Sequence, residues 1–537
     1  MIDTFTPRIA RARRRDWALA VAAIFMGLAP ANGAFGQAIA LRGADGGIRV
    51  LELKPDASRR LTAECDLARV TLESTADQTF RLHIEARARV AEVNYPWNRE
   101  ARQAPYVVYY PELMGRRFGG DTVGEWAWRG SGYPGRLFAP LIIIETEGGR
   151  RTHLLHAADW PPRRVSVMYS RGRESLLARA TIEPSESATF EYRVVDIPGD
   201  WRDAVDAYRA WLAPRMMAAH LADKTPDWML ASHGFLNVQL ENMPRFSVHS
   251  VWRLASRWED TFQWVQFWGQ MSNYAGPSQL ASPSRSADEK VGCCLQDSDV
   301  HGRYLPQLAD WTLNFVSNGS RRAGFYSRPQ ESPDRVFSSP DNLAALRAWH
   351  RTLETKLHGN VHYVDVIGGA DFGPPLAVAE ALQTLTPDLF IESVDQLMER
   401  PSLISGAYQV DDAFPRLGRY LFNKRSMFLG ESNGGGRDWG AEHGYRQETR
   451  AFLLGAKFDA IHPNDVVREI CRLRDEHHWW ERRPVYQDLK GIIEPKDGVE
   501  ATSFDDVNGR RIIVVVRPGR DRPRLEIVEE PGERQLP

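Results

Sequence analysis

The chain has 537 residues, more than one hydrophobic core usually serves, so two or three domains are expected. A hydrophobic fraction of 43% is that of an ordinary globular protein, and a net charge of -2 gives no bulk attraction to nucleic acid or to an anionic membrane. Four cysteines are too few for a disulfide framework, and the adjacent pair Cys293 and Cys294 lacks zinc-site spacing. The composition therefore predicts no nucleic-acid partner, no metal and no cofactor.

Residues 1–38 are expected to be an export signal. Four arginines between Arg11 and Arg15 precede an apolar run from Trp17 to Leu28, which is too short to span a bilayer. Small residues follow, and Ala34-Phe35-Gly36 fits a signal-peptidase site. A twin-arginine signal and a retained membrane anchor are the alternatives. No later segment is long and apolar enough to cross a membrane, so the mature protein is expected to be periplasmic or secreted.

Residues 39–199 are expected to form an N-terminal β-sandwich. Gly47–Leu53 alternates apolar and polar residues, as a half-buried strand does, and Gly or Pro turns separate further short strands. These further strands are predicted at Phe80–Val90, Tyr106–Tyr110, Leu137–Thr146, Val165–Tyr169 and Thr189–Val195.

Residues 200–225 are expected to hold a connecting helix. Asp200 can cap it, and the apolar residues between Trp201 and Leu212 recur at helical spacing. Pro214 is expected to end the helix, because proline lacks the amide hydrogen that a helix interior needs.

Residues 226–487 show strands alternating with amphipathic helices, which is typical of a parallel sheet covered by helices. The strands are predicted at Trp228–Val238, Trp264–Gly269, Gly324–Ser327, Val361–Ile367, Leu389–Val394, Ser426–Leu429 and Phe458–Ile461. Residues 488–537 return to alternation at Arg511–Arg517 and Leu525–Val528. The predicted fold is therefore multidomain α/β plus β: a β-sandwich, a central (β/α)₈ TIM-type barrel and a small C-terminal β-module.

Three acids follow or end predicted strands of this barrel, where function gathers in such folds. Asp365 and Glu392 lie in apolar runs on consecutive strands, and Glu431 follows a later strand. Adjacent strands lie roughly 4.8 Å apart, so the first two carboxyl groups can approach the roughly 5–5.5 Å separation of a retaining glycosidase pair. The alternative is structural: Asp365 caps the next loop and Glu392 pairs with an arginine.

Aromatic and polar residues near the strand ends favour a sugar ligand. Sugar rings pack their C–H faces on aromatic side chains, while their hydroxyl groups need polar partners. Packing of the core is the alternative explanation for each residue. The expected substrate-binding residues are His233, Trp268, His301, Arg303, Tyr326, Arg328 and Asp371.

The order of sandwich, connecting helix and barrel, with Tyr363-Val364-Asp365 and Phe390-Ile391-Glu392, resembles a glycoside-hydrolase-like family. This is an uncharacterised-domain family of the DUF6259 type, distantly similar to α-galactosidase-like enzymes. The resemblance covers about residues 80–470, and it implies that Asp365 is the nucleophile or base and Glu392 the acid. The better-studied enzymes place the second acid on a strand further along, which would make Glu392 a substrate ligand and Glu431 the acid.

The expected function is hydrolysis of an extracellular or periplasmic poly- or oligosaccharide. The carboxyl spacing of roughly 5–5.5 Å expected above favours the retaining mechanism. A non-catalytic glycan-binding protein of polysaccharide secretion or assembly is one alternative. A polysaccharide lyase is the other, and it would need a Lys, Tyr, His or Arg base beside a uronate carboxylate. The sequence leaves open the sugar, the linkage and the oligomeric state.

Overall fold

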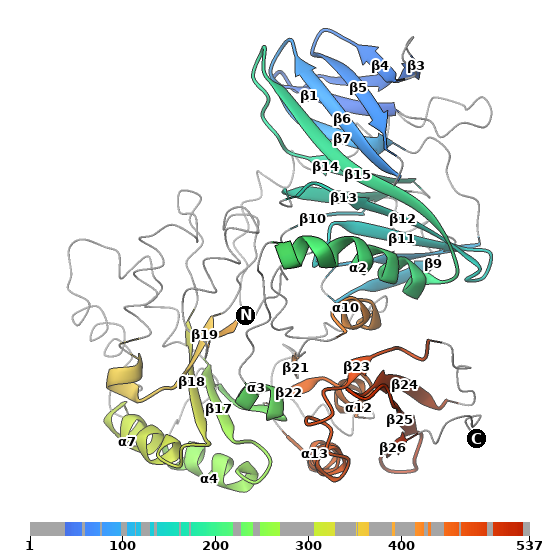
Figure 1. Ribbon diagram of the computed structural model, residues 1–537. Helices are drawn as coiled ribbons and strands as arrows, with labels where there is room; N and C mark the ends of the chain where they lie inside the picture. The colour runs from blue at the N-terminus through green and yellow to red at the C-terminus, as the bar shows by residue number, and fades with distance from the viewer. Residues whose placement is uncertain are drawn as a thin grey trace, which may run out of the picture. The chain divides into compact units, whose positions relative to one another are not determined.

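Figure 1 shows a computed structural model of the chain, which describes residues 38–268 and 305–529 with gaps. The longer internal gaps are 120–128, 219–226, 240–247, 269–304, 328–350, 365–388, 392–413 and 431–444. The chain divides into two compact units, the first drawn mainly from residues up to Ala204 and the second mainly from Val205 onward. The predicted export signal lies outside the described residues except for Ala38, which is buried in the first strand. Among the described helices, none is long and apolar enough to span a membrane.

The first unit consists of two antiparallel sheets. The six-stranded sheet has the order β10-β13-β14-β7-β1-β2, and the nine-stranded sheet has the order β3-β4-β5-β6-β15-β12-β11-β8-β9. Their strands are β1 (Ala38–Gly43), β2 (Ile48–Glu52), β3 (Lys54–Pro55), β4 (Leu61–Glu64), β5 (Ala68–Ser74), β6 (Thr79–Ala86), β7 (Val90–Trp97), β8 (Tyr106–Tyr110), β9 (Arg116–Gly119), β10 (Arg129–Tyr133), β11 (Leu141–Thr146), β12 (Arg151–Ala157), β13 (Val165–Ser170), β14 (Arg173–Ala178) and β15 (Ser187–Pro198).

The two sheets pack face to face, as in a sandwich. The Tyr110 hydroxyl on β8 donates to the Val167 carbonyl oxygen on β13, at 2.7 Å. The Tyr95 ring on β7 lies 5.2 Å from the Phe190 ring on β15, between centroids. Long β15 runs the length of its sheet (Figure 1). Alternating inward residues thus fill the space between the sheets, which is the physical basis of the strand pattern in the sequence.

A buried imidazole also joins the two sheets. His153 on β12 lies with Nε2 at 2.9 Å from Glu174 Oε1 on β14, and with Nδ1 at 3.0 Å from Asp196 Oδ1 on β15. His153 is 4% exposed and Glu174 is 2% exposed. Because carboxylates only accept hydrogen bonds, both contacts are satisfied together when the ring is protonated at both nitrogens.

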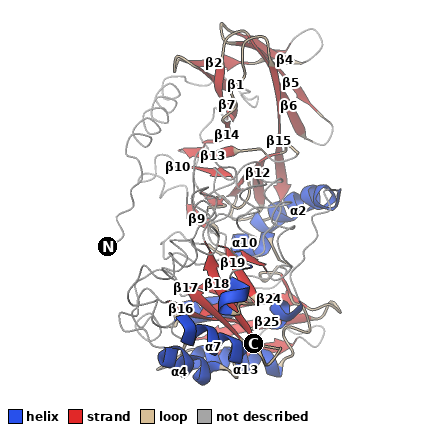
Figure 2. Cartoon of the chain, turned by 90° about the vertical axis from the view of Figure 1, so that its left-hand side faces the viewer, coloured by secondary structure: helices blue, strands red, loops and turns tan. Residues whose placement is uncertain are grey.

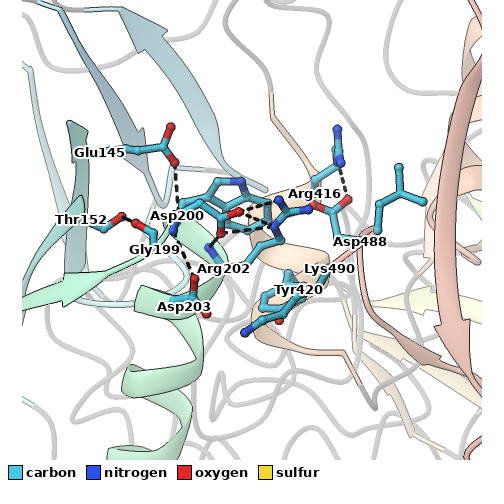
Figure 3. Close-up of polar contacts among 12 residues, drawn as sticks. Glu145, Thr152, Gly199, Asp200, Arg202, Asp203, Arg416, Tyr420, Asp488 and Lys490 are labelled. Carbon is cyan, nitrogen blue, oxygen red and sulfur yellow. Dashed lines mark hydrogen bonds and ion pairs between the residues drawn. The ribbon is translucent and has the colours of Figure 1, made fainter. Parts of the chain in front are cut away.

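Helix α2 (Trp201–Ala218) begins as the sequence predicts and ends later. The Asp200 carboxylate accepts from the Arg202 amide at 2.8 Å, and the Asp203 carboxylate accepts from the Asp200 amide at 3.1 Å, a reciprocal N-terminal cap (Figure 3). Pro214 lies inside the helix, so the prediction that it ends the helix is wrong. Pro214 and Ala210, the residue one turn earlier, are both exposed. Water can therefore satisfy the carbonyl group that proline leaves without an amide partner.

The second unit contains a seven-stranded sheet with every recorded pairing parallel, in the order β20-β19-β18-β17-β16-β22-β21. Helices α4 (Val248–Trp258) and α7 (Leu305–Val316) contact β16 and β18, respectively (Figure 2). The strands are β16 (Gly234–Gln239), β17 (Trp264–Trp268), β18 (Arg322–Ser327), β19 (Val361–Val364), β20 (Leu389–Ile391), β21 (Phe428–Gly430) and β22 (Lys457–Ala460).

The closed eight-stranded barrel that the sequence predicts is not shown. In the described residues the sheet is open, with β20 and β21 at its edges. The first strand, β16, nevertheless pairs with the last, β22. In a closed parallel barrel the first strand likewise pairs with the last. The chain that connects the edge strands β20 and β21 lies mostly outside the described residues.

The predicted strand Trp228–Val238 is instead a short helix, α3 (Asp227–Ala231), followed by β16. Gly234 marks the change. Its φ is +124°, and a Cβ there would lie 2.0 Å from the Phe458 carbonyl oxygen on β22. Only glycine allows the two backbones to approach so closely, so the strand begins at this residue.

The C-terminal sheet is antiparallel, in the order β23-β24-β25-β26. Helices α12 (Arg446–Leu453) and α13 (Asp465–Glu476) contact it. The buried Asp488 carboxylate accepts from Arg416 Nε at 2.5 Å (Figure 3) and from the Tyr486 hydroxyl at 2.8 Å. Arg416 begins helix α10 (Arg416–Leu421), so this ion pair fixes α10 to the sheet. The strands are β23 (Val485–Tyr486), β24 (Glu500–Asp505), β25 (Arg511–Arg517) and β26 (Arg524–Glu529).

Candidate functional site

The three predicted catalytic acids each follow the last residue of a parallel strand. β19 ends at Val364, β20 at Ile391 and β21 at Gly430, and the next residues in the sequence are Asp365, Glu392 and Glu431. The acids themselves lie outside the described residues. The structure therefore describes the strands that lead into the candidate site and their register.

That register brings the ends of β19 and β20 together. The two strands are parallel neighbours, and Val364 pairs with Ile391. β21 is elsewhere in the sheet, hydrogen-bonded to β22 at the opposite edge. Among the described strands, Asp365 and Glu392 follow paired positions, whereas Glu431 follows a strand that only closure of the sheet would bring near β20.

The predicted substrate-binding residues are mostly beyond these strands. Trp268 is the last residue of β17 and Tyr326 lies one residue before the end of β18, which places their backbones at the carboxyl edge of the sheet. Their side chains are outside the described part of the structure, as are all of His301, Arg303, Arg328 and Asp371.

His233 lies at the other end of the sheet, directly before β16. Its Nδ1 accepts from Trp480 Nε1 at 3.1 Å, so Nε2 carries the proton and donates to Asp475 Oδ1 at 2.9 Å. Burial lowers the pKa of His233, against the opposing effect of Asp475. Both ring nitrogens are thus engaged within the protein, at the amino end of the strands, and a role in substrate binding stays a prediction.

A buried polar pair that sequence reasoning did not single out lies nearer the carboxyl edge. Asn237 Nδ2 on β16 donates to Asp459 Oδ1 on β22 at 2.7 Å. Asp459 is 8% exposed and Asn237 is 3% exposed. Burial raises the pKa of Asp459 to about 7, although the hydrogen bond from Asn237 opposes the shift. Asp459 interrupts an apolar run in the sequence, the same signal that drew attention to Asp365, and this signal would have found it.

Gln266 on β17 extends the pair to a third strand. It is fully buried, and it lies opposite Asn237 on one side and opposite Gly324 of β18 on the other. A Cβ at Gly324 would lie 1.9 Å from Gln266 Oε1. The missing side chain of Gly324 therefore provides the space that the Gln266 amide occupies.

Positive charge on these strands is confined to their amino ends. Lys457 is the first residue of β22 and Arg322 is the first of β18. Lys457 is buried, its ammonium donates to the Leu230 carbonyl at 2.8 Å and lies 3.4 Å from the centre of the Trp480 ring, and burial lowers its pKa well below the ordinary value. The carboxyl halves of β16, β17 and β22 carry amides and one carboxyl group instead.

No protein-family model matches the chain, so the resemblance to the DUF6259-type family is not confirmed by one, and no curated protein sequence matches it. Among solved structures, the chain is similar to the galactosidase domain of the α-galactosidase–sucrose kinase AgaSK. The TM-score is 0.51 and the identity 12%, over 90% of this chain and 80% of that one.

Two further solved structures are similar over much of the chain. The cycloalternan-degrading enzyme from Trueperella pyogenes has a TM-score of 0.45 and 11% identity, over 93% of this chain and 95% of that one. The cycloalternan-forming enzyme from Listeria monocytogenes has a TM-score of 0.43 and 9% identity, over 77% and 46%. Scores below 0.5 do not establish a common fold. The likeness to the galactosidase domain, at 0.51, shows that the fold of this chain is similar to that of a glycosidase domain.

Proposed function

We propose that the chain is a glycoside hydrolase that acts on an oligo- or polysaccharide with retention of configuration. The observation that carries the proposal is the register of β19 and β20, in which Val364 pairs with Ile391 and an acid follows each in the sequence. Paired strands lie roughly 4.8 Å apart. Carboxyl groups on the next residue of each strand are then within reach of the roughly 5–5.5 Å separation of a retaining pair.

In this proposal Asp365 is the nucleophile and Glu392 the general acid and base. Asp365 attacks the anomeric carbon while Glu392 protonates the leaving oxygen, which gives a covalent glycosyl ester. Glu392 then removes a proton from water, which attacks the same carbon and releases Asp365. Glu431 is the alternative acid, and it requires the sheet to close so that the end of β21 faces the end of β19.

The proposal includes that closure. The pairing of β16 with β22 leaves one place in the ring, between β20 and β21, for an eighth strand from the chain that connects them. It also includes export, from the arginine-rich and apolar pattern of residues 1–38. Likeness to a galactosidase domain supports a saccharide as substrate, at the level of the fold alone.

The experiment is a screen of the purified full chain against neutral and acidic glycans, with chromatography of the products. On a cleaved substrate, Asp365→Asn is expected to lower kcat about a thousandfold or more while circular dichroism is unchanged. Asp521→Asn, which changes an exposed turn acid of the C-terminal sheet, is the matched control and should keep full activity.

Three results separate the alternatives. NMR of the first-formed product reports its anomeric configuration, and inversion would contradict the retaining assignment. Full activity of Asp365→Asn would remove that residue from the mechanism. Saccharide binding without any product would support a glycan-binding protein, and unsaturated products would identify a lyase.

A further inference from the structure

Asp459, Asn237 and Gln266 form a polar row across three adjacent parallel strands, which we call the inner polar row. Asn237 pairs in register with Gln266, and Asp459 accepts its hydrogen bond from Asn237. Each member lies within two residues of the carboxyl end of its strand. The row therefore lies on the half of the sheet that leads into the candidate site.

Hydrogen bonds among the described residues satisfy this row only in part. Asn237 Oδ1 and Gln266 Oε1 find no hydrogen-bond donor among the described residues, although both side chains are almost completely buried. A buried polar atom without a partner destabilises a fold, and apolar residues of the same shape would avoid the loss. Two carbonyl oxygens with free acceptor capacity are what a ligand hydroxyl or a bridging water needs.

Exposure rises along the row in one direction. Gln266 is 0% exposed, Asn237 3% and Asp459 8%, so Asp459 is the member nearest to solvent. Asn237 holds one oxygen of its carboxyl group and thereby orients the other. Gly324 has no side chain, and this leaves space for the amide of Gln266, the most buried member of the row.

The chemistry of the row fits hydroxyl groups better than anions. Amides both donate and accept, and a carboxyl group whose pKa burial has raised to about 7 does the same near neutral pH. On the four neighbouring strands β16, β17, β18 and β22, no lysine or arginine occurs beyond the first residue. Within these strands, a uronate, sulfate or phosphate group would meet no cation at the carboxyl ends, and the expected substrate-binding residue Arg328, directly after β18, lies outside the described residues.

We propose that the inner polar row, with Asp459 as its contact residue and Asn237 as its positioning residue, binds the hydroxyl groups of an uncharged sugar unit. This inference rests on the proposed function, because it places the saccharide at the same edge of the sheet as Asp365 and Glu392. It goes beyond that function by naming the residues that bind the sugar and by stating that the bound sugar is uncharged.

The test compares a double variant, Asp459→Leu with Asn237→Leu, with the parent chain. Because both partners of one hydrogen bond become apolar at similar size, stability is expected to be nearly unchanged. Thr502→Val is the matched control, since it removes a buried hydrogen bond to the Leu453 carbonyl in the C-terminal sheet. Binding is measured by calorimetry with methyl α-galactoside, α-glucoside and α-mannoside, and with the matching 6-carboxylates, at pH 6.

We expect at least one neutral glycoside to bind the parent and Thr502→Val equally, its 6-carboxylate to bind more weakly, and the double variant to lose roughly tenfold or more in affinity. Equal affinity of parent and double variant overturns the proposal, as does a preference for the 6-carboxylate. Failure of every neutral glycoside to bind below roughly 10 mM overturns it as well.

The outcomes also separate this inference from the proposed hydrolase. If the parent cleaves a glycan and the double variant keeps the parental KM, the row is not a sugar ligand, while the hydrolase proposal stands. Another outcome is that a neutral glycoside binds the parent and not the double variant, while no glycan that contains this sugar is cleaved. In that case the inner polar row is a sugar ligand and the hydrolase proposal fails.

Discussion

The imidazole between the two sheets of the first unit gives a sharp test of what holds that unit together. We consider His153→Leu, which fills a similar volume and removes the contacts to Glu174 and Asp196. Glu174 is 2% exposed, so its carboxylate would lose the ring of His153, which forms a buried ion pair with it when the ring is protonated. Breaking a buried ion pair from one side costs about 3–5 kcal/mol. Asp196 is 38% exposed, so water replaces most of the contact that it loses, and this contact adds little to the decrease in unfolding free energy.

The expected decrease in unfolding free energy is therefore about 3 kcal/mol, the lower end of that range. The double variant His153→Leu with Glu174→Leu is expected to be more stable than His153→Leu alone, because it leaves no buried carboxylate behind. His83→Leu is the control. His83 contacts Thr189 at 3.1 Å from the same sheet, but its side chain is 39% exposed, and the expected change is about 0.5 kcal/mol or less.

Urea unfolding at pH 7 measures these differences, and hydrogen exchange of the β12 and β14 amides assigns them to the first unit of the full chain. A decrease below about 1 kcal/mol for His153→Leu would show that the ion pair is not what joins the sheets. A double variant no more stable than the single one would show that shape, not charge, determines the loss.

Two further predictions concern the parallel sheet. Gly234→Ala is expected to lower the unfolding free energy by about 3 kcal/mol, because a Cβ there meets the β22 backbone. The control is Gly319→Ala, at φ +72° with open space around it, which should lower the unfolding free energy by only about 1–2 kcal/mol. Equal losses of the two variants in urea unfolding would refute the steric argument. Burial raises the pKa of Asp459 from the ordinary 3.8 to about 7 in the folded protein. Between pH 4 and 7 the carboxyl group therefore keeps its proton in the folded chain and loses it in the unfolded chain, so the unfolding free energy falls as the pH rises. Relative to the parent, Asp459→Asn should therefore gain up to about 4 kcal/mol over that range, and a pH-independent difference would contradict the raised pKa.

Local pattern alone determined most of the strand positions. The prediction Tyr106–Tyr110 coincides with β8, and Arg511–Arg517 coincides with β25. Both are short runs of β-branched or aromatic residues bounded by turns, a signal contained in neighbouring residues. Strand β12 (Arg151–Ala157) was not predicted, because polar residues such as His153 occupy buried positions there. Strand β5 (Ala68–Ser74) was not predicted either, although its buried residues are apolar and alternate with less buried ones.

The start of α2 was predictable for the same reason and its end was not. Asp200 caps the helix through contacts with residues two and three positions away. Pro214 continues it because that turn of the helix is exposed to water, which depends on what the rest of the chain covers. Whether a proline breaks a helix is thus decided by its surroundings as well as by its own ring.

By itself, the sequence determined that parallel strands end next to acids, because a strand and the residue after it are neighbours in the chain. Only the tertiary structure decided which strand ends are neighbours in space: β19 beside β20, and β21 beside β22 at the other edge. It alone brought Asn237 and Asp459, 222 positions apart, within 2.7 Å. Contacts between distant strands depend on the register and order of the whole sheet, and no local pattern of residue types encodes them.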